Sequence, residues 1–191
     1  YKRSVVYPSH KSWDGIVSYQ HLTFIELEKK INQYANGLIS QGVKKGERVL
    51  IFIKPCLNFA PITFALFKIG AVPVFIDPGM GVKNLLNAVE QVKPTCLIGI
   101  PKVHLLRQLF KKKFENIKKY FVTGGISFFG IKAIDRIAKV SSFDFEAPQT
   151  GKFESAAVLF TSGGTGTPKG VIYTHDMLIK QTQFLQEEFT L

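Results

Sequence analysis

The chain has 191 residues, of which 46% are hydrophobic, and a formal net charge of +11. This length and composition can bury a core, so they predict one globular domain, or two small lobes, and exclude a disordered chain. No apolar run approaches the roughly 18 residues of a spanning helix, and the first residues lack a signal peptide's apolar segment, so we expect a cytoplasmic protein without a membrane span. Cys56 and Cys96 lie in apolar surroundings without ligand spacing, which predicts two buried free thiols, as in a reducing compartment.

A regular alternation of helical and strand patterns begins at Thr23. Thr23 and Glu26 form a capping box, which predicts the start of a first helix. Its apolar residues recur at helical spacing until Gly42: Phe24, Leu27, Ile31, Tyr34 and Leu38. Residues 48–53 form a continuous apolar run, typical of a parallel strand covered on both faces. Asn58 is suited to cap a helix over residues 59–69, which is apolar nearly all round and is therefore expected to be central.

The alternation continues through the middle of the chain. It predicts strands at residues 72–77, 95–100 and 120–123, and helices at residues 82–89 and 103–110, the second with Pro101 in its first turn. Strand centres recur about every 23 residues without any internal sequence repeat, so the pattern is βα order and not a solenoid. The fold class we expect is α/β, with a mostly parallel sheet flanked by helices on both faces.

Binding sites in such sheets lie at the carboxyl ends of the strands. Residues 77–81 and 123–125 fall at these ends, although they could be turns alone, and for Gly124 and Gly125 the turn interpretation is preferred. Residues 141–155 are typical of a linker. Residues 176–189 predict a final helix with one stripe interpreted as facing the core: Met177, Leu178, Gln181, Leu185 and Phe189.

The densest basic segment, residues 111–119, raises the question of nucleic-acid binding. It lacks an arginine cluster and the interleaved aromatic residues of single-strand binders. Lysines at the end of a helix also complement the helix dipole and keep the surface hydrated. The pattern therefore favours a solvated face over a nucleic-acid site.

The most informative stretch is residues 161–170, between two apolar runs at 156–160 and 171–173 that predict short strands. It reads Thr161, Ser162, Gly163, Gly164, Thr165, Gly166, Thr167, Pro168, Lys169 and Gly170. Glycines let backbone N–H groups turn inward, and with the hydroxyls and the Lys169 cation they can surround anionic oxygens. A hairpin turn would explain the glycines but neither the hydroxyls nor the lysine. The sequence therefore predicts a phosphate-binding loop, and not a Walker loop, because Lys169 precedes glycine instead of Ser or Thr.

This loop, with Val171 and the Thr174–His175 pair, resembles the phosphate-binding motif of adenylate-forming enzymes: acyl-CoA synthetases, luciferases and adenylation domains of nonribosomal peptide synthetases. Gly164 stands where that family usually has Ser or Thr, which removes one hydroxyl but keeps the backbone donors. Residues 22–27 and 66–74 resemble upstream motifs of the family, so the resemblance covers nearly the whole chain. Residues 75–81 are similar to the olefin β-lactone synthetases, a branch often labelled as fatty-acid ligases or peptide synthetases.

The resemblance implies that residues 1–191 are the N-terminal part of an AMP-binding domain. It divides the chain into a βα-repeating part, residues 1–145, and a linker with the loop strands and following helix, residues 146–191. The C-terminal lobe of the family, and the groups that hold adenine, ribose and Mg²⁺, are not expected in these residues. Because Tyr1 is not an initiator methionine, we expect the chain to begin inside a longer one or after processing.

The implied function is that of an ATP-dependent carboxylate ligase that forms an acyl-adenylate and pyrophosphate, on a fatty or β-hydroxy acid. Its partners would be ATP, Mg²⁺ and a carboxylic acid, with CoA or a carrier protein as candidates for a second step. Lys169 would be catalytic by stabilising phosphate charge, and the binding residues would be Thr161, Ser162, Gly163, Gly164, Thr165, Gly166, Thr167 and Lys169. No metal ligand is expected in the chain, and the isolated chain is expected to be inactive.

Two alternatives remain open from the residues. Within the family, the substrate could be an amino acid activated for a peptide synthetase. Outside it, the loop and the charge would also suit a non-catalytic module that binds a nucleotide, another anion or nucleic acid.

Overall fold

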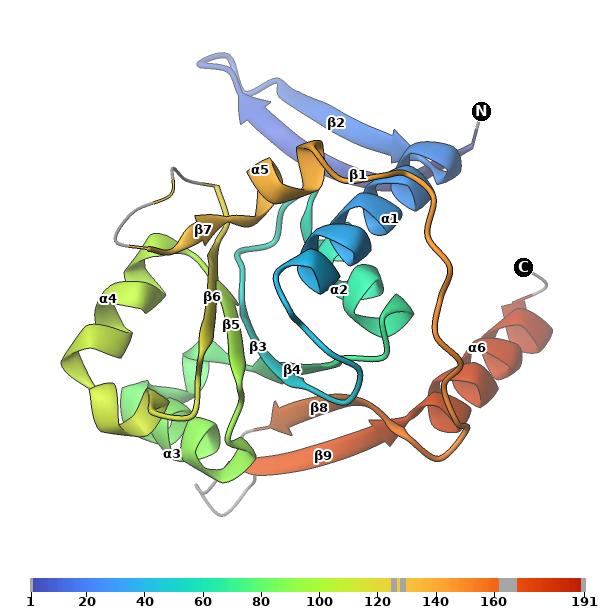
Figure 1. Cartoon of the computed structure of the whole chain (residues 1–191). Coiled ribbons are helices and arrows are strands. Elements are labelled where there is room, and N and C mark those ends of the chain that lie inside the picture. The colour runs from blue at the N-terminus through green and yellow to red at the C-terminus, as the bar shows by residue number, and fades with distance from the viewer. Residues whose placement is uncertain (1, 125–126, 128–129, 162–167, 190–191) are drawn as a thin grey trace.

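The computed structural model describes residues 2–124, 127, 130–161 and 168–189, and every structural statement below concerns these residues. One sheet has the strand order β7-β6-β5-β3-β4-β8-β9, and β1 and β2 form a separate antiparallel pair (Figure 1). Within the large sheet only the β8–β9 pairing is antiparallel. The predicted α/β fold with a mainly parallel sheet and flanking helices is confirmed.

The elements follow one another in the predicted βα order over most of the chain. The strands are β1 (Arg3–Lys11), β2 (Val17–Thr23), β3 (Arg48–Phe52), β4 (Val72–Ile76), β5 (Cys96–Gly99), β6 (Lys119–Val122), β7 (Lys132–Ala133), β8 (Ser155–Thr161) and β9 (Lys169–Thr174). The α-helices are α1 (Phe24–Ser40), α2 (Phe59–Lys68), α3 (Val82–Val92), α4 (Pro101–Leu109), α5 (Ile134–Lys139) and α6 (His175–Phe189), with short 3₁₀ turns η1 (Pro78–Met80) and η2 (Lys111–Phe114).

Helix α1 begins with the predicted capping box. The Thr23 hydroxyl accepts from the Glu26 N–H at 3.3 Å, and the Glu26 carboxylate accepts from the Thr23 N–H at 2.8 Å. Two N–H groups that a helix start leaves unpaired are thereby satisfied. The apolar face of α1 packs on α2 and α5.

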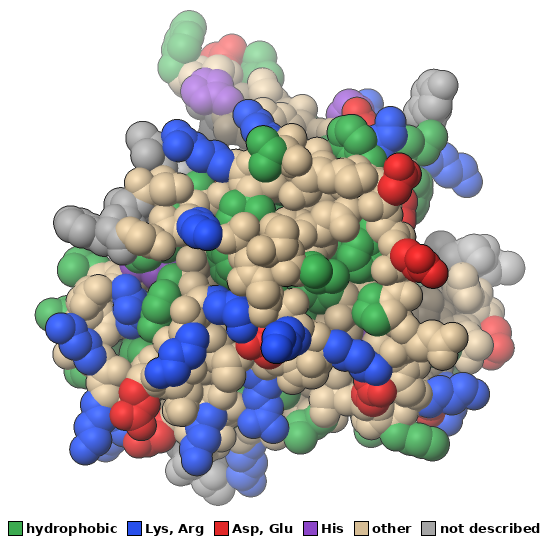
Figure 2. All heavy atoms as spheres, viewed as in Figure 1, with side chains coloured by type: hydrophobic (Ala, Val, Ile, Leu, Met, Phe, Trp, Pro, Cys, Tyr) green, Lys and Arg blue, Asp and Glu red, His purple; other side chains and the backbone are tan. Residues whose placement is uncertain are grey.

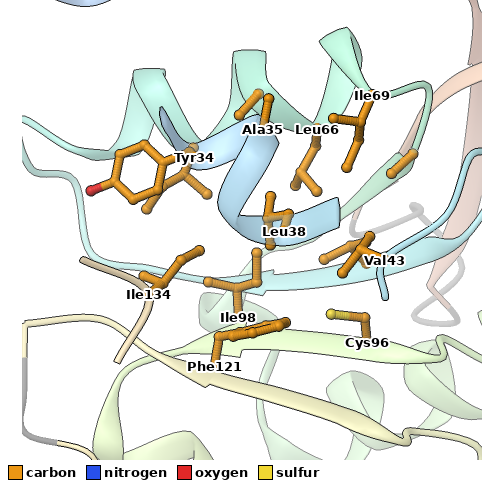
Figure 3. Packing of buried hydrophobic residues seen from close by; sticks show 14 of the residues in the cluster. Tyr34, Ala35, Leu38, Val43, Leu66, Ile69, Cys96, Ile98, Phe121 and Ile134 are labelled. Atoms are coloured by element: carbon orange, nitrogen blue, oxygen red, sulfur yellow. The ribbon is translucent and has the colours of Figure 1, made fainter. Parts of the chain in front are cut away.

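Two hydrophobic clusters lie on opposite faces of the sheet, because successive side chains of a strand point to opposite sides. On β3, Val49 and Ile51 join the cluster under α1 and α2, and Leu50 and Phe52 join the cluster under α3. Figure 3 shows the first cluster, where side chains from α1 and α2 meet those of β5 and β6. A strand that is buried on both faces reads as a continuous apolar run, which is why β3 was predictable.

The prediction that Asn58 caps α2 through its side chain is wrong. Its backbone is helical (φ −88°, ψ −5°), whereas a capping residue is usually extended, and its side chain makes no capping bond. The helix itself is confirmed, but it is not buried all round, since Phe64 is 48% exposed.

The prediction that the stripe on α6 faces a core is wrong within the described residues. No described residue of α6 is buried, because the helix lies beyond the end of the sheet and contacts mainly β8 and β9 (Figure 1). The thiol prediction is half right: both cysteines are free, but only Cys96 is buried and Cys56 is half-buried. Burial raises the pKa of the Cys96 thiol well above its usual range.

Three features were not predicted. The β1–β2 hairpin carries little alternation to read, since Leu22 is the single buried residue of β2 and Trp13 at the tip is 99% exposed. The two-residue β7 and the six-residue α5 are too short for a periodic pattern.

In the described part of the chain, no helix combines the length and hydropathy needed to cross a bilayer.

Candidate functional site

The predicted phosphate loop joins two paired strands of the large sheet. In the β8–β9 register Thr161 lies opposite Lys169, so these two residues flank the two ends of the loop. Both side chains are exposed, and Pro168 beside Lys169 is buried. The other predicted site residues, Ser162, Gly163, Gly164, Thr165, Gly166 and Thr167, lie outside the described residues. The structure thus places the first and last residues of the predicted set next to each other and leaves the rest as a prediction.

Gly170 has a packing reason of its own. It lies opposite Phe160 in the register, and a Cβ atom built at position 170 would come within 2.9 Å of the Phe160 ring. The ring is buried in the cluster beneath α3. A side chain at Gly170 would push that ring out of a well-packed site. Glycine at this position therefore allows β9 to pack closely against Phe160 of β8, next to Lys169.

The hairpin ends at the carboxyl edge of the parallel strands. Strand β8 runs parallel to β4 with Phe160 beside Ile76, so Thr161 lies at the same edge as Asp77. The Asp77 side chain accepts from the Gly79 N–H at 2.8 Å, which accounts for that aspartate as part of a turn. The same edge carries the predicted turn at Gly124, whose φ of +62° favours glycine.

A cavity of about 540 Å³ opens at the carboxyl ends of β3, β5 and β6. Open parallel sheets form such crevices where neighbouring strands connect in opposite directions, here between β3, which leads to β4, and β5, which leads to β6. The lining combines apolar residues with polar ones from four segments: Ile53, Lys54, Cys56, Asn58, Ile100, Pro101, Lys102, Thr123, Gly124 and Asp135.

Asp135 is the centre of a polar network in this cavity. Its Oδ1 accepts from the Tyr34 hydroxyl at 2.6 Å and from the Asn58 amide at 3.0 Å, and its Oδ2 accepts from the Gly124 N–H at 3.4 Å. The Lys30 ammonium in turn donates to the side-chain oxygen Oδ1 of Asn58 at 3.1 Å. Burial, together with the hydrogen bond and charge of Asp135, raises the pKa of the Tyr34 hydroxyl well above its usual range, so this hydroxyl stays protonated and donates to Asp135.

Sequence reasoning missed this network. Tyr34 was assigned to the apolar face of a helix, and Asp135 lies on α5, which carried no detectable pattern. Asn58 gave no usable signal, because its sequence position predicts a helix cap and only the structure shows that its side chain makes no capping bond. Its position just before α2 brings its amide to Asp135, 77 residues away along the chain.

A second cavity, of about 340 Å³, lies between the ends of β3 and β4 and is almost entirely apolar. Its walls include Phe59, Phe75, Ile76, Leu85 and Val103. No group of three or more His, Cys, Asp or Glu side chains is arranged to hold a metal among the described residues. The described carboxyl edge therefore offers an exposed lysine and threonine, a mainly apolar cavity with polar groups around Asp135, and a second apolar cavity, but no described metal site.

These features define the class of the protein: an α/β protein whose glycine- and hydroxyl-rich segment connects the paired strands β8 and β9. The family model for AMP-binding enzymes matches residues 2–191, and the chain belongs to that family. It is similar to the olefin β-lactone synthetase of Xanthomonas campestris, with 32% identity over 186 residues, covering 96% of this chain and 33% of that protein.

Solved structures agree with this assignment. The chain is similar to a long-chain-fatty-acid–CoA ligase from Archaeoglobus fulgidus, with a TM-score of 0.79 and 26% identity over 90% of this chain and 33% of that one. Its fold also matches an anthranilate CoA ligase in complex with anthranoyl-AMP, with a TM-score of 0.75 and 22% identity over 82% of this chain and 30% of that one. The chain spans about a third of the length of these relatives.

Proposed function

We propose that the full-length protein activates a carboxylic acid with ATP, and that this chain supplies the loop that holds the leaving phosphates. The observation that carries the proposal is the hairpin that sets Thr161 against Lys169 at the carboxyl edge, in a chain of the AMP-binding family. Support comes from a structural relative that holds an acyl-adenylate, anthranoyl-AMP, and from another that is a fatty-acid–CoA ligase.

In the proposed reaction a carboxylate oxygen attacks the α-phosphorus of ATP. The new bond joins the acyl oxygen to phosphorus, the bond from the α-phosphorus to the α–β bridging oxygen breaks, and pyrophosphate leaves with the electron pair. Negative charge grows on the leaving phosphates, where the Lys169 ammonium and the hydroxyls of Thr161, Ser162, Thr165 and Thr167 would stabilise it. The glycines Gly163, Gly164 and Gly166 would let backbone N–H groups approach the same oxygens. No general base is needed, because a carboxylate is already ionised at neutral pH.

Mg²⁺ is the expected companion of ATP in this chemistry, where it would neutralise phosphate charge. Among the described residues, no group of three or more His, Cys, Asp or Glu side chains is arranged to hold this ion. The division at residue 145 between a βα part and the loop part also remains a proposal.

For the substrate we propose a fatty or β-hydroxy acid. The support is the 32% identity to an olefin β-lactone synthetase and the 26% identity to a long-chain-fatty-acid–CoA ligase. CoA or a carrier protein is the proposed acceptor if a second step transfers the acyl group. The two free cysteines agree with a cytoplasmic location, which we keep as part of the proposal.

The test is ATP-dependent pyrophosphate release by the full-length protein with a panel of fatty, β-hydroxy, aromatic and amino acids. We expect release with at least one fatty or β-hydroxy acid and none without an acid. Release with amino acids alone would replace the substrate proposal by the peptide-synthetase alternative. The absence of release with every acid would contradict the ligase proposal itself.

A second candidate is a non-catalytic module that binds nucleotide or nucleic acid, favoured by the net charge of +11. Calorimetric titration of the 191-residue chain with ATP·Mg²⁺ and with duplex DNA separates the two. Tight DNA binding that weakens steeply with salt would favour the module.

A further inference from the structure

Helix α4 and the turn η2 form a surface that the proposed reaction does not use. The outward side of α4 carries Leu105 and Leu109, which are 64% and 72% exposed and one helical turn apart, and Phe110 follows at the end of the helix. The inward side is satisfied, because His104 is buried and Val103 and Leu106 pack on the cluster beneath α3. The helix therefore has a second apolar side with no partner in the described chain, although helices that are apolar on both sides are normally covered.

The leucines lie in a segment of the chain that is rich in cationic residues. Residues 101–114 contain five cationic side chains and no Asp or Glu. Two of the five are engaged within the fold: Lys113 pairs with Glu90, and the Arg107 guanidinium stacks 4.0 Å from the centre of the Tyr120 ring. Lys102, Lys111 and Lys112 are exposed and form no ion pair within the described residues.

The arrangement is visible on the surface. In Figure 2 lysine and arginine side chains lie across the lower half of the molecule, and at the lower left hydrophobic and a few acidic side chains lie among them. Figure 1 places α3 and α4 in that region, on the outside of the sheet and away from the β1–β2 hairpin at the top. The start of α4 lines the two cavities at the carboxyl edge, through Pro101, Lys102 and Val103, but Leu105, Leu109 and Phe110 line neither of them.

We propose that this α4–η2 surface docks the protein on an anionic lipid bilayer, with Leu105, Leu109 and Phe110 entering the interface and Lys111 and Lys112 contacting headgroups. Exposed apolar side chains flanked by lysines are typical of interfacial helices, which lie in the membrane plane and do not cross it. The charge is complementary to anionic headgroups, and the lysine stems extend that contact. Duplex DNA would use the lysines but would leave the leucines exposed to water.

The experiment is co-sedimentation of the 191-residue chain with phosphatidylcholine vesicles, with and without phosphatidylserine, at low and at high salt. We expect binding to the anionic vesicles, loss of most of it at high salt, and little binding to neutral vesicles. Lys111→Gln with Lys112→Gln should weaken binding about 25-fold, or roughly fivefold per lysine. Leu105→Ser with Leu109→Ser should weaken it by about tenfold or more, because the apolar contact is lost.

Matched controls carry the same substitutions elsewhere on the exposed surface. Lys139→Gln with Lys152→Gln and Val140→Ser with Phe153→Ser should leave binding unchanged. Circular dichroism checks the fold of each variant, and the lipid and salt comparison on the unaltered chain stands even if a variant fails to fold. The single tryptophan, Trp13, reports on the hairpin, and we expect no change in its emission on vesicle binding.

The inference is overturned if the chain does not bind anionic vesicles. It is also overturned if replacing the leucine pair leaves vesicle binding unchanged, which would indicate nonspecific charge attraction. A blue shift of the Trp13 fluorescence emission on vesicle binding would place the contact on the β1–β2 hairpin instead. Tighter binding to duplex DNA than to anionic vesicles, indifferent to the leucines, would assign the surface to nucleic acid. None of these outcomes bears on pyrophosphate release, so this inference and the ligase proposal fail independently.

Discussion

At the scale of single residues, the side chains that tie distant segments together are polar groups buried among apolar ones. Tyr34 is 3% exposed, and its hydroxyl donates to Asp135, 101 residues further along the chain. The sequence placed Tyr34 correctly on the inner face of a helix, because helical spacing reports burial. It could not identify the partner, because a hydrogen bond between α1 and α5 depends on how the helices pack and not on any local pattern.

Tyr34→Phe tests this link. Removing the hydroxyl should lower the free energy of unfolding by about 1.5 to 3 kcal/mol, because a bond to a charged carboxylate is lost within a partly buried network. The measurement is urea denaturation, with Tyr19→Phe as the matched control, since Tyr19 is 62% exposed in β2. Equal stabilities of the two variants would show that the Tyr34–Asp135 bond contributes nothing to the fold.

At the scale of elements, the sequence predicted what periodicity and continuous apolar runs can report. The first helix, the four central strands and the helices between them were predictable, because each buries a face against the same sheet. The β1–β2 hairpin, β7 and α5 were not, because one is exposed on most of its surface and the other two are too short. The α6 stripe has the period of a buried face, but no described element covers it.

Glu47 holds the amino ends of three strands together. Its carboxylate accepts from the Thr95 hydroxyl at 3.1 Å and from the Lys44 N–H at 2.7 Å, and it pairs with Lys119. Burial alone would raise the Glu47 pKa, but these hydrogen bonds outweigh it and hold the pKa below its ordinary value of 4.5. The folded state therefore favours the ionised form. Its contribution to stability is present above about pH 4.5 and is lost as the pH falls through the lower folded pKa.

Glu47→Gln should therefore cost about 1 to 3 kcal/mol at neutral pH and make stability less sensitive to pH below 4.5. Thermal unfolding from neutral to acidic pH measures both effects. Glu188→Gln on the exposed surface of α6 is the control, and we expect it to match the unaltered chain. If Glu47→Gln loses stability in acid as steeply as the unaltered chain, Glu47 is not responsible for that part of the profile.

At the scale of the whole molecule, the sequence predicted the family and the α/β fold. It could do so because Thr161 through Gly170 has a composition that packing does not require, apart from Gly170 itself, which fits against Phe160. The cavity around Asp135 could not be predicted from the sequence, because the residues that line it come from four separate segments. The chain spans about a third of its relatives, so the site as a whole remains a proposal.

We expect the 191-residue chain alone to form no acyl-adenylate. Its predicted loop would contact only the leaving end of ATP, whereas the reaction also requires the acid and the nucleoside in near-attack geometry, which can supply roughly 7 to 11 kcal/mol of barrier lowering. Incubation with ATP, Mg²⁺ and fatty or β-hydroxy acids, followed by mass spectrometry, checks this. Turnover equal to that of the full-length protein would show that the groups holding acid and nucleoside lie within this chain.

The central claim is that the loop ending at Lys169 binds the phosphates that leave. Lys169 is exposed at the start of β9, so Lys169→Ala should leave the unfolding midpoint unchanged. The decisive measurement is kcat/KM for adenylation by the full-length protein carrying Lys169→Ala, beside Lys152→Ala, an exposed lysine in the linker before β8. We expect kcat/KM to fall about tenfold or more in Lys169→Ala, because the phosphate charge loses its cation, and to stay unchanged in Lys152→Ala. An unaltered kcat/KM in Lys169→Ala would contradict the central claim.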